Sequence, residues 1–212
     1  MKNETRARRR YQSWKDWILF HRLVIGILAQ WLGALLATAI LVAPATGWAQ
    51  KGQAWILIDT QALTLTVFSA EKHVLVRFHN ISIGSGGAAE SHRRGDETTP
   101  QGIFHVTWVD RHSRFGTFYG LDYPNAKIAR IAYFEGIISE AEFDSIMQAL
   151  RHHRTPPQNT ALGGQLGIHG IGRGDPAVQH VVNWTDGCVA LSNRDIRLLS
   201  RWVQVGTRVV IR

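Results

Sequence analysis

Sulfur is scarce in this sequence: its 212 residues include one cysteine, Cys188, and two methionines. No disulfide can form within such a chain, and a structural zinc site built from several thiolates is excluded. An unpaired cysteine in an exported protein forms an intermolecular disulfide or serves as a reactive thiol. The interpretation of Cys188 therefore depends on export and on its sequence neighbours.

Acidic residues are also few, with 16 Asp and Glu against 24 Lys and Arg, which gives a formal net charge of +8. An excess of this size can indicate nucleic-acid binding, so its position along the chain matters. Residues 1–49 contain seven basic and two acidic side chains, so +5 of the +8 lies there and +3 lies on the rest. We therefore predict no nucleic-acid partner.

Charge is absent between residues 23 and 43, directly after the basic N-terminus. Because basic flanks and apolar runs of this kind mark export elements, we prefer export to a buried core helix for residues 1–49. A membrane anchor needs roughly 20 apolar residues, which fits this run. Gly47 and Ala49 also suit signal cleavage before Gln50, so both alternatives stay open. Either one directs residues 50–212 to the periplasm or cell envelope.

Period-two alternation of apolar and polar residues, typical of strands, dominates residues 50–212. We predict strands in residues 55–68, 74–83, 102–109 and 205–212. The intervening residues 84–102 are dense in glycine, charge and proline and predict a long loop or an exposed hairpin. No alternation of strands with helices is visible, so the predicted fold is a single β-rich α+β domain.

Two helices are predicted within this domain. Ser139 and Glu142 have the spacing of a reciprocal capping box at the start of a helix, with Pro156 as its stop. A second helix is predicted to begin near Ser192 or Asn193. Strands therefore outnumber helices.

The residues that suggest chemistry lie between 167 and 196. Cys188 follows His169 by 19 residues, a separation that a loop between two strands can close. Cysteine and histidine can act as nucleophile and base, with the base drawing the thiol proton so that thiolate is present near neutral pH. Gly187 allows backbone N–H groups to approach a substrate oxyanion. A lone cysteine is more often an inert buried residue, so this pair needs further support.

That support is a resemblance to the L,D-transpeptidase catalytic domain. The family signature is a His-Gly pair, a spacer, and then Ser or Thr, His, Gly and Cys, and this sequence has His169-Gly170 followed by Thr-Asp-Gly-Cys at 185–188. Gly-Asp, Thr-Pro and Gly at 95–102 are similar to another family segment. The resemblance extends over nearly all of residues 55–212 and implies a mixed β-sheet or sandwich fold.

The resemblance also implies the roles of individual residues. Cys188 is the expected nucleophile and His169 the expected base, which the carbonyl of Gly170 orients. The amides of Gly187 and Cys188 are expected to bind the oxyanion. Thr185 and Asp186 are also assigned to the site. The residues expected to bind substrate are Tyr123, Asn125 and Trp184.

Two positions depart from the family pattern. Asp186 stands where most members have histidine, and Ala190 where many have arginine. An ionised carboxylate cannot donate a hydrogen bond and opposes thiolate formation nearby. Alanine also removes a guanidinium that can hold a substrate carboxylate. These two positions therefore bear on the rate and on the choice of acyl acceptor.

The function implied is that of a peptidoglycan L,D-transpeptidase, which forms a thioester between a cell-wall stem peptide and Cys188 and then transfers it to an amine. A stem diaminopimelate or a lipoprotein lysine are the amines considered. The alternatives are a hydrolase that releases a wall-linked peptide or lipoprotein, and a noncatalytic wall-binding module, for which Arg93 and Arg94 offer a basic face. No HExxH spacing supports a zinc peptidase, so no metal or other cofactor is predicted.

Overall fold

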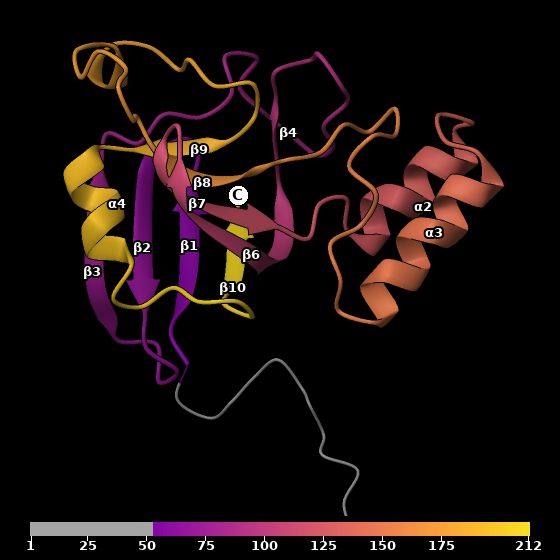
Figure 1. Ribbon diagram of the computed structural model, residues 1–212, viewed down its shortest axis with the longest axis horizontal. Helices are drawn as coiled ribbons and strands as arrows, with labels where there is room; N and C mark the ends of the chain where they lie inside the picture. The colour runs from indigo at the N-terminus through magenta and orange to yellow at the C-terminus, as the bar shows by residue number, and fades with distance from the viewer. Residues whose placement is uncertain (1–52) are drawn as a thin grey trace, which may run out of the picture. The chain divides into compact units, whose positions relative to one another are not determined.

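An eight-stranded mixed β-sheet is the centre of the protein, for which the computed structural model describes residues 53–212 (Figure 1). Its strand order is β3-β2-β1-β10-β6-β7-β8-β9. The strands are β1 Trp55–Asp59, β2 Thr64–Phe68, β3 Val74–His79, β6 Gly102–Ser113, β7 Gly116–Leu121, β8 Gly167–Gly170, β9 Val189–Leu191 and β10 Arg208–Ile211. The predicted export segment, residues 1–49, lies outside the described residues.

Strand β6 connects the two halves of this sheet. Its 12 residues pair first with β10, between Gly102 and His105, and then with β7, from Val106 onward. Neighbouring strands are antiparallel except for the pairs β1–β10 and β8–β9, which are parallel. The order of the strands therefore brings β8 and β9, which are distant in sequence from β1–β3, to the opposite edge.

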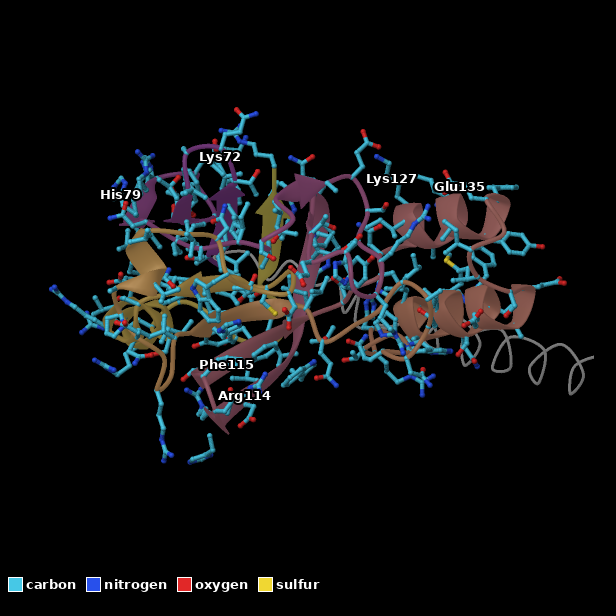
Figure 2. All side chains as sticks on the ribbon, turned by 90° about the horizontal axis from the view of Figure 1, so that it is seen from above. Lys72, His79, Arg114, Phe115, Lys127 and Glu135 are labelled. Atoms are coloured by element: carbon cyan, nitrogen blue, oxygen red, sulfur yellow. The ribbon has the colours of Figure 1, made fainter. Side chains whose placement is uncertain are left out.

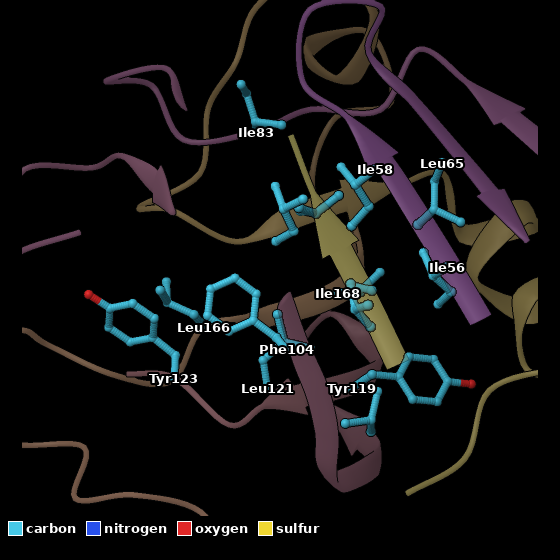
Figure 3. Close-up of a cluster of buried hydrophobic side chains, with 14 of the residues drawn as sticks. Ile56, Ile58, Leu65, Ile83, Phe104, Tyr119, Leu121, Tyr123, Leu166 and Ile168 are labelled. Atoms are coloured by element: carbon cyan, nitrogen blue, oxygen red, sulfur yellow. The ribbon is translucent and has the colours of Figure 1, made fainter. Parts of the chain in front are cut away.

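The predicted β-rich α+β fold is confirmed. In β6, Phe104 and Val106 are fully buried whereas Ile103, directly before Phe104, is 50% exposed, as strand alternation requires. Figure 3 shows the core to which these strands contribute, with Ile56, Ile58 and other apolar side chains gathered against the sheet. Burial of this apolar face is the main force that holds the sheet in one register.

Three α-helices accompany the sheet in residues 53–212: α2 Ala126–Phe134, α3 Glu140–Arg151 and α4 Asn193–Leu199. The predicted capping box is present at the start of α3, where the Ser139 hydroxyl accepts from the Glu142 amide and the Glu142 carboxylate accepts from the Ser139 amide. Helix α3 ends at Arg151, before the predicted proline stop.

Helix α2 was not predicted from the sequence. Its N-cap residue is Asn125, whose side chain accepts a hydrogen bond from the amide of Ile128. Tyr133 of α2 stacks on Phe143 of α3 with 5.0 Å between ring centroids, and the two helices lie side by side in Figure 1. None of the helices in the described part of the chain is long and apolar enough to cross a membrane.

The loop predicted at residues 84–102 is closed by a short parallel ladder, β4 Ala88–Ala89 with β5 Thr99–Pro100. A hairpin would have paired its arms antiparallel, so the long-loop alternative is the correct one. Ahead of the loop, Ser82 forms a bridge with Ala190 of β9. The loop therefore begins beside the strand that follows Cys188.

Candidate active site

Strands β8 and β9 bring the two predicted reactive residues together. His169 of β8 is paired with Ala190 of β9, and Cys188 directly precedes β9. Because successive side chains of an extended chain point to opposite faces, Cys188 lies on the same face as Ala190 and His169. The side chains of Cys188 and His169 line one cavity of about 740 Å³.

The imidazole of His169 is held by the residue that follows it. Its Nδ1 lies 2.6 Å from the carbonyl oxygen of Gly170, the contact that the family resemblance implied. A carbonyl oxygen only accepts, so Nδ1 carries the proton and Nε2 presents a lone pair. No residue in the range 53–212 hydrogen-bonds Nε2, which leaves it available to a group in the cavity.

Aromatic rings surround this imidazole. Phe115 stacks on it at 4.2 Å between centroids, Phe118 lies at 5.5 Å, and Trp184 meets it edge-on at 5.9 Å. Burial lowers the pKa of His169, the hydrogen bond to Gly170 acts in the opposite direction, and the charge of Arg114 lowers it further. The imidazole is therefore neutral at pH 7, the state in which it can accept a proton.

Arg114 and Phe115 form the turn between β6 and β7, and Figure 2 shows the two side chains together at that connection. The guanidinium carbon of Arg114 lies 4.6 Å from the centroid of the Phe115 ring. Both side chains line the cavity. The hairpin thus supplies an apolar cover for His169 and a positive charge beside it, and neither residue was assigned to the site from the sequence.

The surroundings of Cys188 favour the protonated form of its thiol. Burial raises the pKa of the thiol to about 12, opposed by a hydrogen bond from the Gly167 backbone and assisted by the charge of Asp186. Its Sγ lies 3.5 Å from the carbonyl oxygen of Gln165. Desolvation thus opposes the thiolate expected near neutral pH and outweighs the contacts that stabilise it. Any nucleophilic reaction of Cys188 needs a base at the moment of attack.

The turn before Cys188 is braced by Thr185. The Thr185 hydroxyl donates to the Cys188 carbonyl at 2.6 Å and accepts from the Gly187 amide at 3.3 Å. Gly187 has a φ of +119°, and a Cβ there would lie 2.6 Å from the Thr98 carbonyl oxygen, so only glycine fits. The Gly187 amide, expected to bind an oxyanion, is occupied by Thr185 in this structure.

The Gly-Asp and Thr-Pro segment holds this turn from the other side. The Thr99 hydroxyl accepts from the Gly84 amide at 2.8 Å and donates to the Gly187 carbonyl at 2.9 Å. Asp96 accepts from the backbone amides of Arg93 and Thr98 and so shapes the loop. The spacing of this motif is thus explained by its contacts with the turn that carries Cys188.

Residues 53–211 match the YkuD family, the L,D-transpeptidase catalytic domain. The chain belongs to this family. Among curated proteins, none matches the chain.

Solved structures with similar folds share little sequence with this L,D-transpeptidase domain. The helical cell shape determining protein Pgp2 from Campylobacter jejuni is 18% identical with a TM-score of 0.52, covering 77% of this chain and 48% of that one. Bd1075 from Bdellovibrio bacteriovorus is 19% identical with a TM-score of 0.47, covering 76% and 48%. An L,D-transpeptidase from Mycobacterium smegmatis is 15% identical with a TM-score of 0.41, covering 76% and 59%. The chain thus spans about half the length of the first two proteins.

The remaining predicted site residues of the L,D-transpeptidase domain divide into two groups. Trp184 and Asp186 line the cavity, with Asp186 exposed. Tyr123 is fully buried, its hydroxyl donates to the His92 carbonyl, and it is not among the residues that line the cavity. Asn125 is also outside the cavity lining, because its side chain caps α2.

The structure also places Ala190 and Arg94 relative to the cavity. Ala190 is fully buried, so position 190 contributes no side chain to the cavity. Arg94, interpreted as part of a solvated basic face, is exposed, and it also lines the cavity and donates to the Thr160 carbonyl at 2.9 Å. Within residues 53–212, no group of three His, Cys, Asp or Glu side chains is arranged to hold a metal ion.

Proposed function

We propose that this domain is a peptidoglycan L,D-transpeptidase that uses Cys188 as its nucleophile and His169 as its base. The donor is a stem peptide, cut between its third residue, diaminopimelate, and its fourth, D-Ala. The observation that carries the proposal is the position of the His169 imidazole, which shares the cavity with Cys188 and is held through Nδ1 by Gly170, while Nε2 has no partner among residues 53–212.

The first half of the reaction follows from the protonation states. Nε2 of His169 takes the proton from Cys188 as Sγ attacks the carbonyl carbon of the third stem residue. The tetrahedral intermediate then collapses, the C–N bond breaks, and the leaving D-Ala nitrogen takes the proton from His169. Because the free thiol is protonated and the imidazole neutral, this transfer is general-base catalysis within one cavity.

Trp184 and Arg94 are well placed to contact a donor. Both line the cavity, Trp184 beside His169 and Arg94 on the loop that carries the Gly-Asp motif. A guanidinium on this wall can bind a stem-peptide carboxylate in place of the one absent at position 190. The amide of Cys188 is the proposed donor to the oxyanion, since the Gly187 amide is directed to Thr185.

Transfer to an amine is the proposed second half, with a stem diaminopimelate or a lipoprotein lysine as acceptor. The exposed carboxylate of Asp186 on the cavity wall favours an ammonium-bearing acceptor by charge. The same carboxylate can orient a water molecule, which makes hydrolysis of a wall-linked peptide or lipoprotein the second candidate.

Purified muropeptides separate these outcomes. The protein is incubated with tetrapeptide muropeptides, with and without a lysine peptide, and the products are identified by mass spectrometry. Transfer predicts crosslinked or lysine-linked products, whereas free tripeptide alone identifies a hydrolase. Cys188→Ala must abolish turnover while the protein stays folded. Activity in that variant, or no thioester in the parent protein, contradicts the proposal and leaves a wall-binding module.

We also propose that the domain works outside the cytoplasm. This follows from the basic and apolar residues before position 50, which lie outside the described residues. A reporter fused at the C-terminus should be active only outside the cytoplasm. The size of the protein relative to a chain that starts at Gln50 distinguishes a cleaved signal from an anchor.

A further inference from the structure

A second histidine, His92, lines the same cavity from the loop of residues 84–101. Its side chain is 5% exposed, and its Nδ1 lies 2.7 Å from the Thr98 carbonyl oxygen and 2.9 Å from Oδ1 of Asp96. Although burial acts in the opposite direction, backbone hydrogen bonds from Thr98 and Arg93 keep the pKa of Asp96 below its usual value, so its carboxyl group is ionised. Both neighbours of Nδ1 therefore accept, and Nδ1 carries the proton.

The other ring nitrogen of His92 is left for the cavity. Nε2 has no hydrogen-bond partner among residues 53–212. It is not one of the fully buried polar atoms that lack a partner, so it is open to a group in the cavity. A Cβ on Gly163 would lie 3.0 Å from Nε2, and a Cβ on Gly187 would lie 3.1 Å from Cε1. The ring thus sits between two glycines, one of which directly precedes the proposed nucleophile. Nε2 is therefore close to the place where an acyl group on Cys188 would be attacked.

His92 and His169 share one arrangement and differ in their surroundings. In each, Nδ1 lies at hydrogen-bond distance from a backbone carbonyl, and Nε2 has no partner in the described part of the chain. His169 is enclosed by aromatic rings and lies near Arg114, both of which oppose a positive ring. His92 has an ionised carboxylate beside it, which attracts a positive ring. The two rings therefore have different neighbours in one cavity, a cation and aromatic rings around His169 and a carboxylate beside His92.

From this geometry we propose that His92 is a second catalytic residue, whose Nε2 takes the proton from the acyl acceptor when it attacks the thioester on Cys188. The inference rests on the proposed function, because it concerns the second half of that reaction. His169 would serve the attack by the thiol, and His92 the attack by the amine or water. The two bases approach Cys188 from different elements, β8 and the 84–101 loop.

The atoms balance as follows. The acceptor nitrogen, or water oxygen, forms a bond to the carbonyl carbon of the thioester while its proton passes to Nε2 of His92. The tetrahedral intermediate collapses, the C–S bond breaks, and its electron pair returns to Sγ of Cys188. Solvent in the cavity then carries the proton from His92 to the thiolate. This restores the protonated thiol and the neutral imidazole of the starting enzyme.

The test measures the two halves separately in the full-length protein carrying His92→Gln. Release of D-Ala in the first turnover reports acylation, and intact mass reports the lifetime of the acyl-enzyme with a lysine peptide present. Acylation should stay within about twofold of the parent, whereas the acyl-enzyme should persist roughly 100-fold longer, a common loss for a missing general base. His79→Gln, an exposed histidine on β3, is the matched control and should change neither rate.

A second variant separates chemistry from packing. In His92→Ala, added imidazole should shorten the acyl-enzyme lifetime, whereas pyrazole, which has the same shape and is a far weaker base, should not. If the variants slow acylation and acyl transfer equally, or if imidazole and pyrazole rescue equally, the role assigned to His92 is wrong, while the proposed function stands. An unchanged lifetime in both variants does the same. If the parent protein forms no thioester at Cys188, the proposed function fails and this inference falls with it.

Discussion

Thr99→Val tests whether the motif loop braces the turn that carries Cys188. Thr99 is fully buried, and its hydroxyl joins the Gly84 amide to the Gly187 carbonyl at 2.8 and 2.9 Å. Valine keeps the shape of the side chain and removes the hydroxyl, so both backbone groups lose their partner. A buried polar group left unpaired costs about 1–3 kcal/mol, so the loss should be about 2–6 kcal/mol in the free energy of unfolding.

Urea unfolding followed by tryptophan fluorescence measures this cost. With a urea m value of about 2 kcal/mol/M, the midpoint should fall by about 1–3 M. Thr99→Ser is the matched control, because it keeps the hydroxyl and loses only a methyl group, which costs about 1 kcal/mol. The order of stability should therefore be parent, serine variant, valine variant.

The same variants should differ in activity. Without the bond from Thr99, the Gly187 carbonyl is free to rotate, so the valine variant should form the thioester at Cys188 more slowly even in the absence of urea. If the valine variant is as stable as the serine variant, the hydroxyl is not the brace. The structural explanation of the Thr-Pro motif would then be wrong.

The remaining predictions concern charge, burial and inhibition. A carbapenem should acylate Cys188, because its β-lactam ring is a strained amide that the same thiol can attack. The adduct should appear in the intact mass of the protein, and an unmodified mass at high drug concentration would contradict the prediction. When the acylation rate is plotted against pH, its fall on the acid side should have a midpoint below about 6.5, the usual pKa of histidine. Burial lowers the pKa of His169, so the base stays neutral to a lower pH. Phe115→Ala should move that midpoint toward 6.5 by admitting water, and an unmoved limb would assign the titration to another group. Asp186→Asn should lower the pKa of the thiol, because the carboxylate raises it; the midpoint of alkylation rate against pH measures this and must not rise. Tyr119→Phe should leave stability unchanged or raise it by up to about 1 kcal/mol, because the buried hydroxyl has no hydrogen-bond partner within residues 53–212, and a clear loss in thermal unfolding would show a hidden partner.

Local patterns were enough to predict much of the fold. The alternation in β6 predicts which of its side chains are buried, because period two is a property of the extended chain itself. The Ser139 capping box is equally local, since its two hydrogen bonds join residues three apart. The pairing of Cys188 with His169 was also predictable, but through the resemblance of their motifs to a family.

Helix α2 and the role of Tyr123 needed the tertiary structure. Helix α2 is short, and it is stabilised by contacts such as Tyr133 on Phe143 of α3, which no local pattern contains. Tyr123 stands in a motif segment that suggested a substrate contact. The fold instead turns its side chain into the core, where the hydroxyl holds the His92 backbone.

Sequence alone thus determined which residues are proposed to carry the chemistry, because a nucleophile and a base are recognised by residue type and by their place in a motif. Only the tertiary structure decided their state. Burial raises the pKa of the Cys188 thiol and lowers the pKa of the His169 imidazole, whose ring is covered by Phe115 and Trp184 from other parts of the chain. The position of His92 in the cavity also depends on the tertiary structure, because the loop of residues 84–101 must fold against the turn at Gly187. Burial and charge act through space, whereas a sequence pattern records only order along the chain.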